Sequence, residues 1–127
     1  MQKEKRLNQL SRLRQTLREL LDDLQESLEV AFGRAPMIKC NVYELARRCG
    51  KPSCACARGV LHRSMVLTWS QGGRSKLFSI PSERLSELQA KSAEYLEFRR
   101  ARARVTPICK KILSVMDRME KLRREEP

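Results

Sequence analysis

Three of the five cysteines and the only histidine lie in one short segment, at Cys49, Cys54, Cys56 and His62. Three thiolates and one imidazole supply the four ligands of a closed, tetrahedral zinc site. Such a site leaves no open position for water or substrate, so its zinc ion stabilises a fold rather than catalysing a reaction. The spacing, Cys-x4-Cys-x-Cys-x5-His, differs from the common cysteine pair separated by two residues. We therefore predict a structural zinc site with these four ligands.

Other interpretations of these residues stay open from the sequence. Cys40 competes for the fourth ligand position if the imidazole of His62 points outward. The thiols could instead hold an iron–sulfur cluster, form a disulfide between Cys49 and Cys54, or be structural thiols without any metal. Basic residues beside the cysteines favour the thiolate form, which is the form that binds metal.

The same segment does not match a catalytic zinc site. Zinc deaminases place His-x-Glu before Pro-Cys-x-x-Cys, whereas here the histidine follows the cysteines and Ser64 occupies the glutamate position. The chain also contains no phosphate-binding loop, no Gly-x-Ser-x-Gly motif and no second histidine to act as a base. We expect no enzymatic activity and no small-molecule substrate.

Positive charge is concentrated around the predicted metal site. The net charge is +12, and residues 36–80, which we call the head, contain eight basic side chains and only one acidic one, Glu44. A nearly unopposed basic segment binds polyanions and releases their counterions. The predicted nucleic-acid-binding residues of the head are Lys39, Arg47, Arg48, Lys51, Arg58, Arg63, Arg74 and Lys76. Arg99, Arg100, Arg102 and Arg104 extend this set on a predicted helix. The alternative explanation of the charge is solubility alone.

The segments on both sides of the head are predicted to be helical. Residues 3–33 carry leucines at a spacing of three and four, typical of a heptad seam: Leu7, Leu10, Leu17, Leu21, Leu24 and Leu28. Leu13 and Leu20 widen this stripe. Residues 108–122 carry a second apolar stripe, and Pro107 either kinks that helix or separates it from a preceding one. These stripes predict a bundle or coiled-coil stalk that forms a homo-oligomer or binds a partner protein.

The head itself is predicted to contain three short strands around the metal loop. Residues 37–48 begin with alternating apolar side chains, and the runs at 64–69 and 75–80 flank Gly72-Gly73, a strong hairpin signal. The predicted fold class is therefore α+β and mainly helical, with a long N-terminal helix, C-terminal helices and a three-stranded β/zinc head. The predicted segments are an N-terminal amphipathic helix (1–35), the head (36–80) and a C-terminal helical segment (81–127).

The composition also bears on the location of the protein. No segment approaches 18 consecutive apolar residues, so we expect no membrane span. The N-terminus lacks the apolar core of a secretory signal. Five cysteines, an odd number clustered in one segment, fit a reducing compartment better than a secreted disulfide framework. The predicted location is the cytoplasm.

The string Cys49-Gly50-Lys51-Pro52, followed by Cys54, Cys56, Gly59 and His62, resembles an uncharacterised family of bacterial, archaeal and phage proteins. This family is the domain of unknown function numbered six-seven-eight-eight, and the resemblance covers about residues 38–104. Family members usually continue the histidine with Gly-Pro-Tyr, whereas this chain has Arg63-Ser64-Met65. The resemblance implies no activity. The family's association with mobile elements implies an accessory or regulatory factor of a mobile element or phage.

Two functions follow as hypotheses from the sequence. The first is a small, zinc-stabilised, basic protein that binds DNA or RNA without catalysing a reaction. The alternative is a coiled-coil assembly adaptor that binds a partner protein, in which the zinc ion is purely structural.

Overall fold

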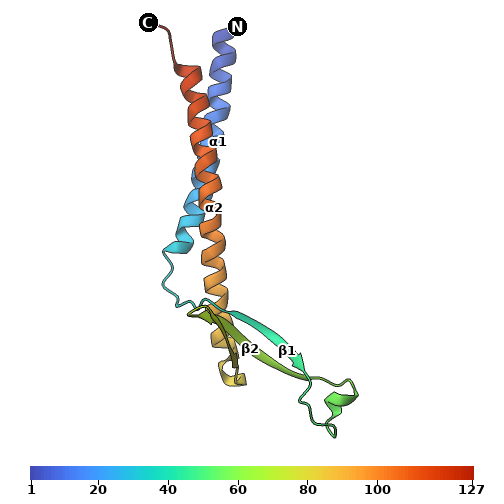
Figure 1. The fold of residues 1–127 in the computed structure, drawn as a ribbon. Helices are drawn as coiled ribbons and strands as arrows, with labels where there is room; N and C mark the ends of the chain where they lie inside the picture. Colours follow the sequence, from blue (N-terminus) through green and yellow to red (C-terminus); the bar gives the residue numbers. More distant parts are fainter. The chain divides into compact units, whose positions relative to one another are not determined.

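The computed structural model describes residues 1–127 and contains two long helices and one small sheet (Figure 1). The elements are α1 (Gln2–Ala31), β1 (Asn41–Arg47), η1 (Ala55–Arg58), β2 (His62–Gln71), β3 (Arg74–Ser79), η2 (Ser82–Arg84) and α2 (Leu85–Arg123), where η1 and η2 are short 3-10 helices. The predicted α+β, mainly helical class is confirmed. No helix is both long enough and apolar enough to span a membrane.

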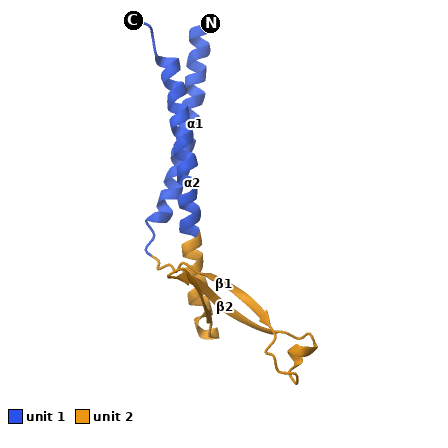
Figure 2. Ribbon diagram, in the orientation of Figure 1, with its two compact units in different colours: residues 1–34, 97–127 blue, residues 35–96 orange.

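The chain forms two compact units (Figure 2). Unit 1 contains Met1–Arg34 and Glu97–Pro127, and unit 2 contains Ala35–Leu96. Helix α2 begins in unit 2 and ends in unit 1. The predicted metal ligands all belong to unit 2, whereas the predicted leucine stripe belongs to unit 1.

In unit 1, α1 and the C-terminal part of α2 lie side by side and run antiparallel (Figure 1). The core consists of Leu13, Leu20 and Val115. Five half-buried side chains pack against it: Leu17, Ile108, Ile112, Met119 and Leu122. The apolar stripe predicted for residues 108–122 is therefore the face that α2 presents to α1, as its helical spacing requires.

The buried face of α1 differs from the predicted heptad seam. Leu13 and Leu20, expected only to widen the stripe, are 6% and 8% exposed. Leu7, Leu21 and Leu28, expected in the seam, are 54%, 57% and 42% exposed. The leucines occupy three adjacent columns of the helix, and a single neighbouring helix covers only part of so wide a stripe.

Helix α2 continues through Pro107 without a break. Of the two predicted alternatives, the separation into two C-terminal helices is wrong. Proline lacks the N–H that would bond the carbonyl of Ala103, which costs the helix one hydrogen bond. Apolar packing on both sides of the proline offsets this cost, since Ala101 and Val115 are buried in unit 1.

In unit 2, the three strands form an antiparallel sheet in the order β1-β2-β3. Gly72 and Gly73 have φ values of 57° and 78°, the two positive angles that a type I′ hairpin turn requires, so the predicted hairpin is confirmed. The first strand starts at Asn41 rather than near residue 37. The backbone N–H of Ile38 donates to the carbonyl of Lys91 in α2, which attaches this segment to the helix instead of the sheet.

The sheet is anchored on the first turns of α2. Val66 and Leu67 of β2 are 0% and 6% exposed, and Leu88 of α2 is 3% exposed. The hydroxyl of Ser92 also donates to the carbonyl of Cys40 at 3.4 Å, just before β1 begins. These contacts hold the β1–β2 pair, which in turn carries the predicted metal loop.

Candidate metal centre

The loop between β1 and β2 carries the predicted ligands. Arg47 pairs with His62 at the open end of the β1–β2 ladder. Cys49 follows β1 by two residues, Cys54 precedes η1, and Cys56 lies within it. Gly59 ends η1 with φ of 101°, a conformation that favours glycine. Because strand pairing brings the two ends of the loop together, the first and last ligands meet although thirteen positions separate them in sequence.

The structure brings all four predicted ligands together. One donor atom from each of Cys49, Cys54, Cys56 and His62 lies within 4.8 Å of the others. The sulfur atoms of Cys49 and Cys56 are 3.4 Å apart, and that of Cys54 is 3.2 Å from Nε2 of His62. Tetrahedral zinc with three sulfurs and one nitrogen requires donor separations of about 3.5–3.8 Å. The four side chains therefore fit a single metal ion with small adjustments.

The thiols of the cluster differ in pKa, because backbone hydrogen bonds and burial act on them unequally. The backbone N–H of Lys51 contributes most to lowering the pKa of Cys49, with further hydrogen bonds from neighbouring thiols. The N–H of Cys49 donates to the sulfur of Cys56 at 3.3 Å. This bond lowers the pKa of Cys56, but burial and the neighbouring thiols outweigh it, so the pKa is raised overall. Cys56 is the buried member, at 1% exposed.

The remaining two cysteines lie outside the cluster. Cys40, the predicted competitor of His62, is half-buried before β1 and is not among the grouped donors. Cys109 is exposed on α2 in unit 1. All five cysteines are free thiols. The cluster can hold a metal ion with the predicted four donors and without Cys40.

The twelve predicted nucleic-acid-binding residues are all exposed. Eight belong to unit 2, and the four arginines at 99, 100, 102 and 104 belong to α2 in unit 1. Two of the twelve have partners. Arg63 forms an ion pair of 2.7 Å with Glu44, the single acidic residue of the head. Arg104 donates to the hydroxyl of Ser27 at 3.4 Å.

The sheet register determines on which face of the sheet the basic side chains of β3 lie. Lys76 pairs with Trp69 and Arg74 with Gln71, which places these cations on one face of the sheet. Phe78 shares that face, and Arg84 lies over its ring at 5.9 Å from the centroid. Sequence reasoning missed Arg84, because nothing local signals a cation stacked on an aromatic ring across a turn.

Comparisons with known proteins identify a family and nothing closer. No curated protein and no solved structure matches this chain. A family model described as Domain of unknown function (DUF6788) matches residues 7–90, which is about two thirds of the chain. The match begins in α1, before the predicted resemblance, and includes the whole sheet and the metal loop. This chain, with its Cys/His loop between β1 and β2, therefore belongs to the family of Domain of unknown function (DUF6788).

Proposed function

We propose that this protein is a zinc-stabilised, non-catalytic, nucleic-acid-binding protein that contacts its ligand through the head. The observation that carries the proposal is the charge balance of residues 36–80. Their single acidic side chain, Glu44, is paired with Arg63, and none of the other seven basic side chains forms an ion pair. These exposed cations gain from neutralising phosphates, since counterions are released on binding.

The donor set of the loop favours zinc over other common metals. Three thiolates and an imidazole are soft ligands, whereas magnesium and calcium prefer oxygen. Four protein donors would close the coordination shell, which supports a structural rather than a catalytic ion. The loop has little other packing, because Cys56 is its only buried residue. We therefore assign to the metal the role of holding the loop, and with it Arg48, Lys51 and Arg58, in one conformation.

The ligand class is a polynucleotide recognised through its phosphates. Phosphate contacts fix position but carry no direct base information, so the basic residues support affinity and not a preferred sequence. Whether the ligand is DNA or RNA is the first result that the experiment below returns. The accessory or regulatory role in a mobile element or phage stays a prediction from the family resemblance.

The test replaces four cations at and beside the metal loop with glutamine: Arg47, Arg48, Lys51 and Arg58. Binding is measured by fluorescence anisotropy with single- and double-stranded DNA and RNA of one length, over a series of salt concentrations. We expect weaker binding and a shallower dependence of log K on log salt, by about 0.7–0.9 for each phosphate that the variant no longer neutralises.

The matched control removes the same charge from unit 1 by replacing Lys5, Arg12, Arg18 and Arg118, all exposed, with glutamine. Zinc content is measured in both variants, so that loss of the metal is not mistaken for the removal of phosphate-binding cations. Equal affinity and equal salt dependence in the head variant and the wild type would reject the proposal. If the head variant and the unit 1 control variant lose the same affinity, the loss depends only on net charge, and the proposal is also rejected.

The alternative function, an adaptor for a different protein, draws on the exposed leucines of α1. It predicts that the head variant keeps its biological partner and that substitution of Leu21 abolishes binding of that partner. The two functions are therefore separable by variants in different units.

A further inference from the structure

Besides the terminal Met1, unit 1 exposes six large apolar side chains, which we call the outer face. They are Leu7 (54% exposed), Leu21 (57%), Leu28 (42%) and Phe32 (80%) from α1 and its end, and Leu113 (60%) and Met116 (52%) from α2. The three leucines of α1 lie at multiples of seven residues and so share one column of the helix, with Phe32 one turn further on. This column spans roughly 37 Å along α1.

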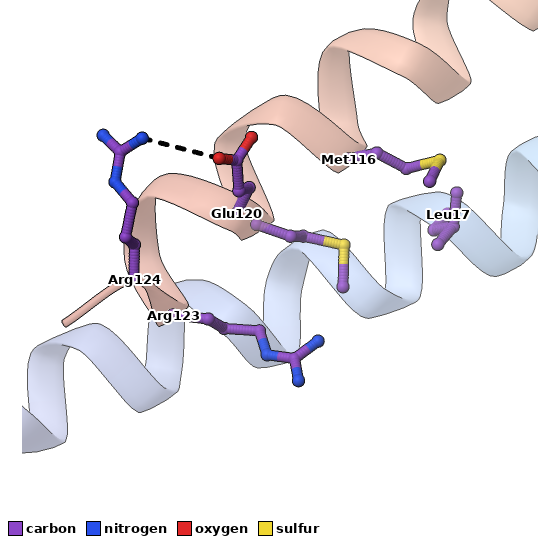
Figure 3. A pocket seen from close by; sticks show the side chains of 6 residues that line it. Leu17, Met116, Glu120, Arg123 and Arg124 are labelled. Carbon is purple, nitrogen blue, oxygen red and sulfur yellow. Dashed lines mark hydrogen bonds and ion pairs between the residues drawn. The ribbon is translucent and has the colours of Figure 1, made fainter.

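Two adjoining grooves show that the side chains from the two helices lie on the same side. The first is lined by Leu17, Met116 and Met119, and Figure 3 shows Leu17 and Met116 directed toward one another. The second is lined by Leu7, Leu10, Arg14 and again Met119. Because both grooves contain Met119, the α1 column and Met116 border one continuous surface.

These grooves are open spaces between the two helices. Their volumes are about 530 Å³ and 380 Å³, room enough for several inserted side chains. The opposite side of the helix pair has a different character. Its groove is lined by Gln9, Arg12, Arg118 and Lys121 beside the core leucines. Charged residues line the grooves on both sides, since Arg123 lines both grooves of the outer face. What distinguishes the outer face is its column of exposed leucines.

The exposed area of the chain is large for its mass. The protein exposes 10585 Å², whereas a folded monomeric protein of this mass, 14.8 kDa, exposes roughly 7,000 Å². A stable interface removes about 800 Å² from each partner. That total includes both units. The part that a second copy would cover is the outer face, whose six side chains are each 42–80% exposed.

The core of unit 1 is also small. Only four apolar residues of the unit are less than 9% exposed: Leu13, Leu20, Ala101 and Val115. Long helices in water are stabilised mainly by packing of their apolar faces rather than by helix propensity. Two helices that leave a whole leucine column uncovered therefore lack part of the packing that their sequence provides for.

We infer that the outer face is a dimer interface and that its occupant is the outer face of a second copy of this chain. A two-fold interface must be self-complementary, with the same apolar patch on both subunits. The outer face meets this condition, since the same exposed leucines would face one another across the two-fold axis. Leu7 also lines an open groove that a leucine of the second copy can enter. Pairing two such helix hairpins gives a four-helix bundle, in which the exposed column of Leu7, Leu21 and Leu28 becomes part of the core.

Arg14 interrupts the leucine column between Leu7 and Leu21 and lies in the second groove. A polar residue at a core position lowers the stability of an assembly while it limits the number of allowed registers. We assign this role to Arg14 in the dimer. Its replacement by leucine then has an effect opposite in sign to that of the other outer-face substitutions.

The experiment uses the full chain, freed of nucleic acid, so that its outcome does not depend on the proposed function. Analytical ultracentrifugation over a concentration series measures the mass and the dimer dissociation constant. We expect a wild-type mass of twice 14.8 kDa at high concentration. The double variant Leu21→Gln/Leu28→Gln is expected to weaken the dimer by roughly 100-fold or more. Arg14→Leu is expected to strengthen it severalfold.

The control replaces two similarly exposed apolar residues of unit 2 with glutamine, as Val60→Gln/Leu77→Gln, and is expected to leave the dimer unchanged. Circular dichroism reports whether each variant keeps its helices. If the double variant unfolds, the Arg14→Leu variant still tests the inference. A dimer dissociation constant that this substitution leaves unchanged would reject the proposed interface. A wild type that stays monomeric at every concentration overturns the inference and leaves a different protein as the occupant.

Discussion

At the scale of single residues, the four donors of the metal loop are not equivalent. Cys56 is buried and accepts a hydrogen bond from the backbone N–H of Cys49, whereas Cys49 and His62 are exposed. A buried thiol without metal must stay protonated or bear the cost of desolvating a thiolate, and its raised pKa reflects that cost. Cys56 is therefore the ligand whose replacement should damage the site most.

Replacing Cys56 with serine is expected to abolish stoichiometric zinc binding, because three donors remain and a hydroxyl is a poor ligand for zinc. Metal content of the purified protein, measured by elemental analysis together with native mass spectrometry, checks this outcome. Cys40→Ser and Cys109→Ser, which change cysteines outside the cluster, should each retain one zinc ion per chain. Loss of zinc from the Cys40→Ser variant would instead indicate that Cys40 is one of the ligands.

At the scale of elements, α2 contains a proline between two packed residues, Ala101 before it and Ile108 after it. Pro107 is exposed and lies inside a helix of 39 residues, so its cost comes from the backbone rather than from core packing. The missing N–H leaves the carbonyl of Ala103 without its usual helical donor. The helix tolerates this because its apolar stripe is held by α1 beyond the proline.

Pro107→Ala is expected to stabilise unit 1 by about 1–3 kcal/mol, since it restores one hydrogen bond and a favourable helix residue. Thermal and denaturant unfolding followed by circular dichroism measures the change. Thr106→Ala, at the exposed neighbouring position, serves as the control and should shift stability far less. A Pro107→Ala protein with unchanged or lower stability would contradict a continuous helix at this position.

At the scale of the whole molecule, the two proposed surfaces belong to different units. The metal donors and eight of the basic residues are in unit 2, and the outer face is in unit 1. Each unit has its own buried residues, Val66 and Leu67 in one and Leu13 and Leu20 in the other. Removal of the metal should therefore act on unit 2 without disturbing the packing of unit 1.

Removal of zinc with a chelator is expected to lower nucleic-acid affinity while leaving most of the helical signal intact. The reason is that the proposed metal would stabilise the loop that carries Lys51 and Arg58, whereas α1 packs on α2 in the other unit. Anisotropy and circular dichroism on the same sample measure both effects, and Cys56→Ser should behave like the chelated wild type. If the protein keeps its full nucleic-acid affinity after complete removal of zinc, the metal is not needed for the proposed function.

The sequence alone determined the features that depend on local spacing. The four candidate metal donors and the Gly72-Gly73 turn were predictable, because all of them lie within one loop or one turn of the chain. The basic head follows from the composition of residues 36–80. Local chemistry also marked α1 and the stripe of α2 as amphipathic helices.

Only the tertiary structure decided which face of α1 is buried, which basic residue is paired and where α2 ends. It placed Leu13 and Leu20 in the core beside Leu17 of the predicted seam and left Leu7, Leu21 and Leu28 exposed. It also paired Arg63 with Glu44 and carried α2 through Pro107. Each of these outcomes depends on a neighbour distant in sequence. A helix with three leucine columns has no preferred face until another helix covers one of them.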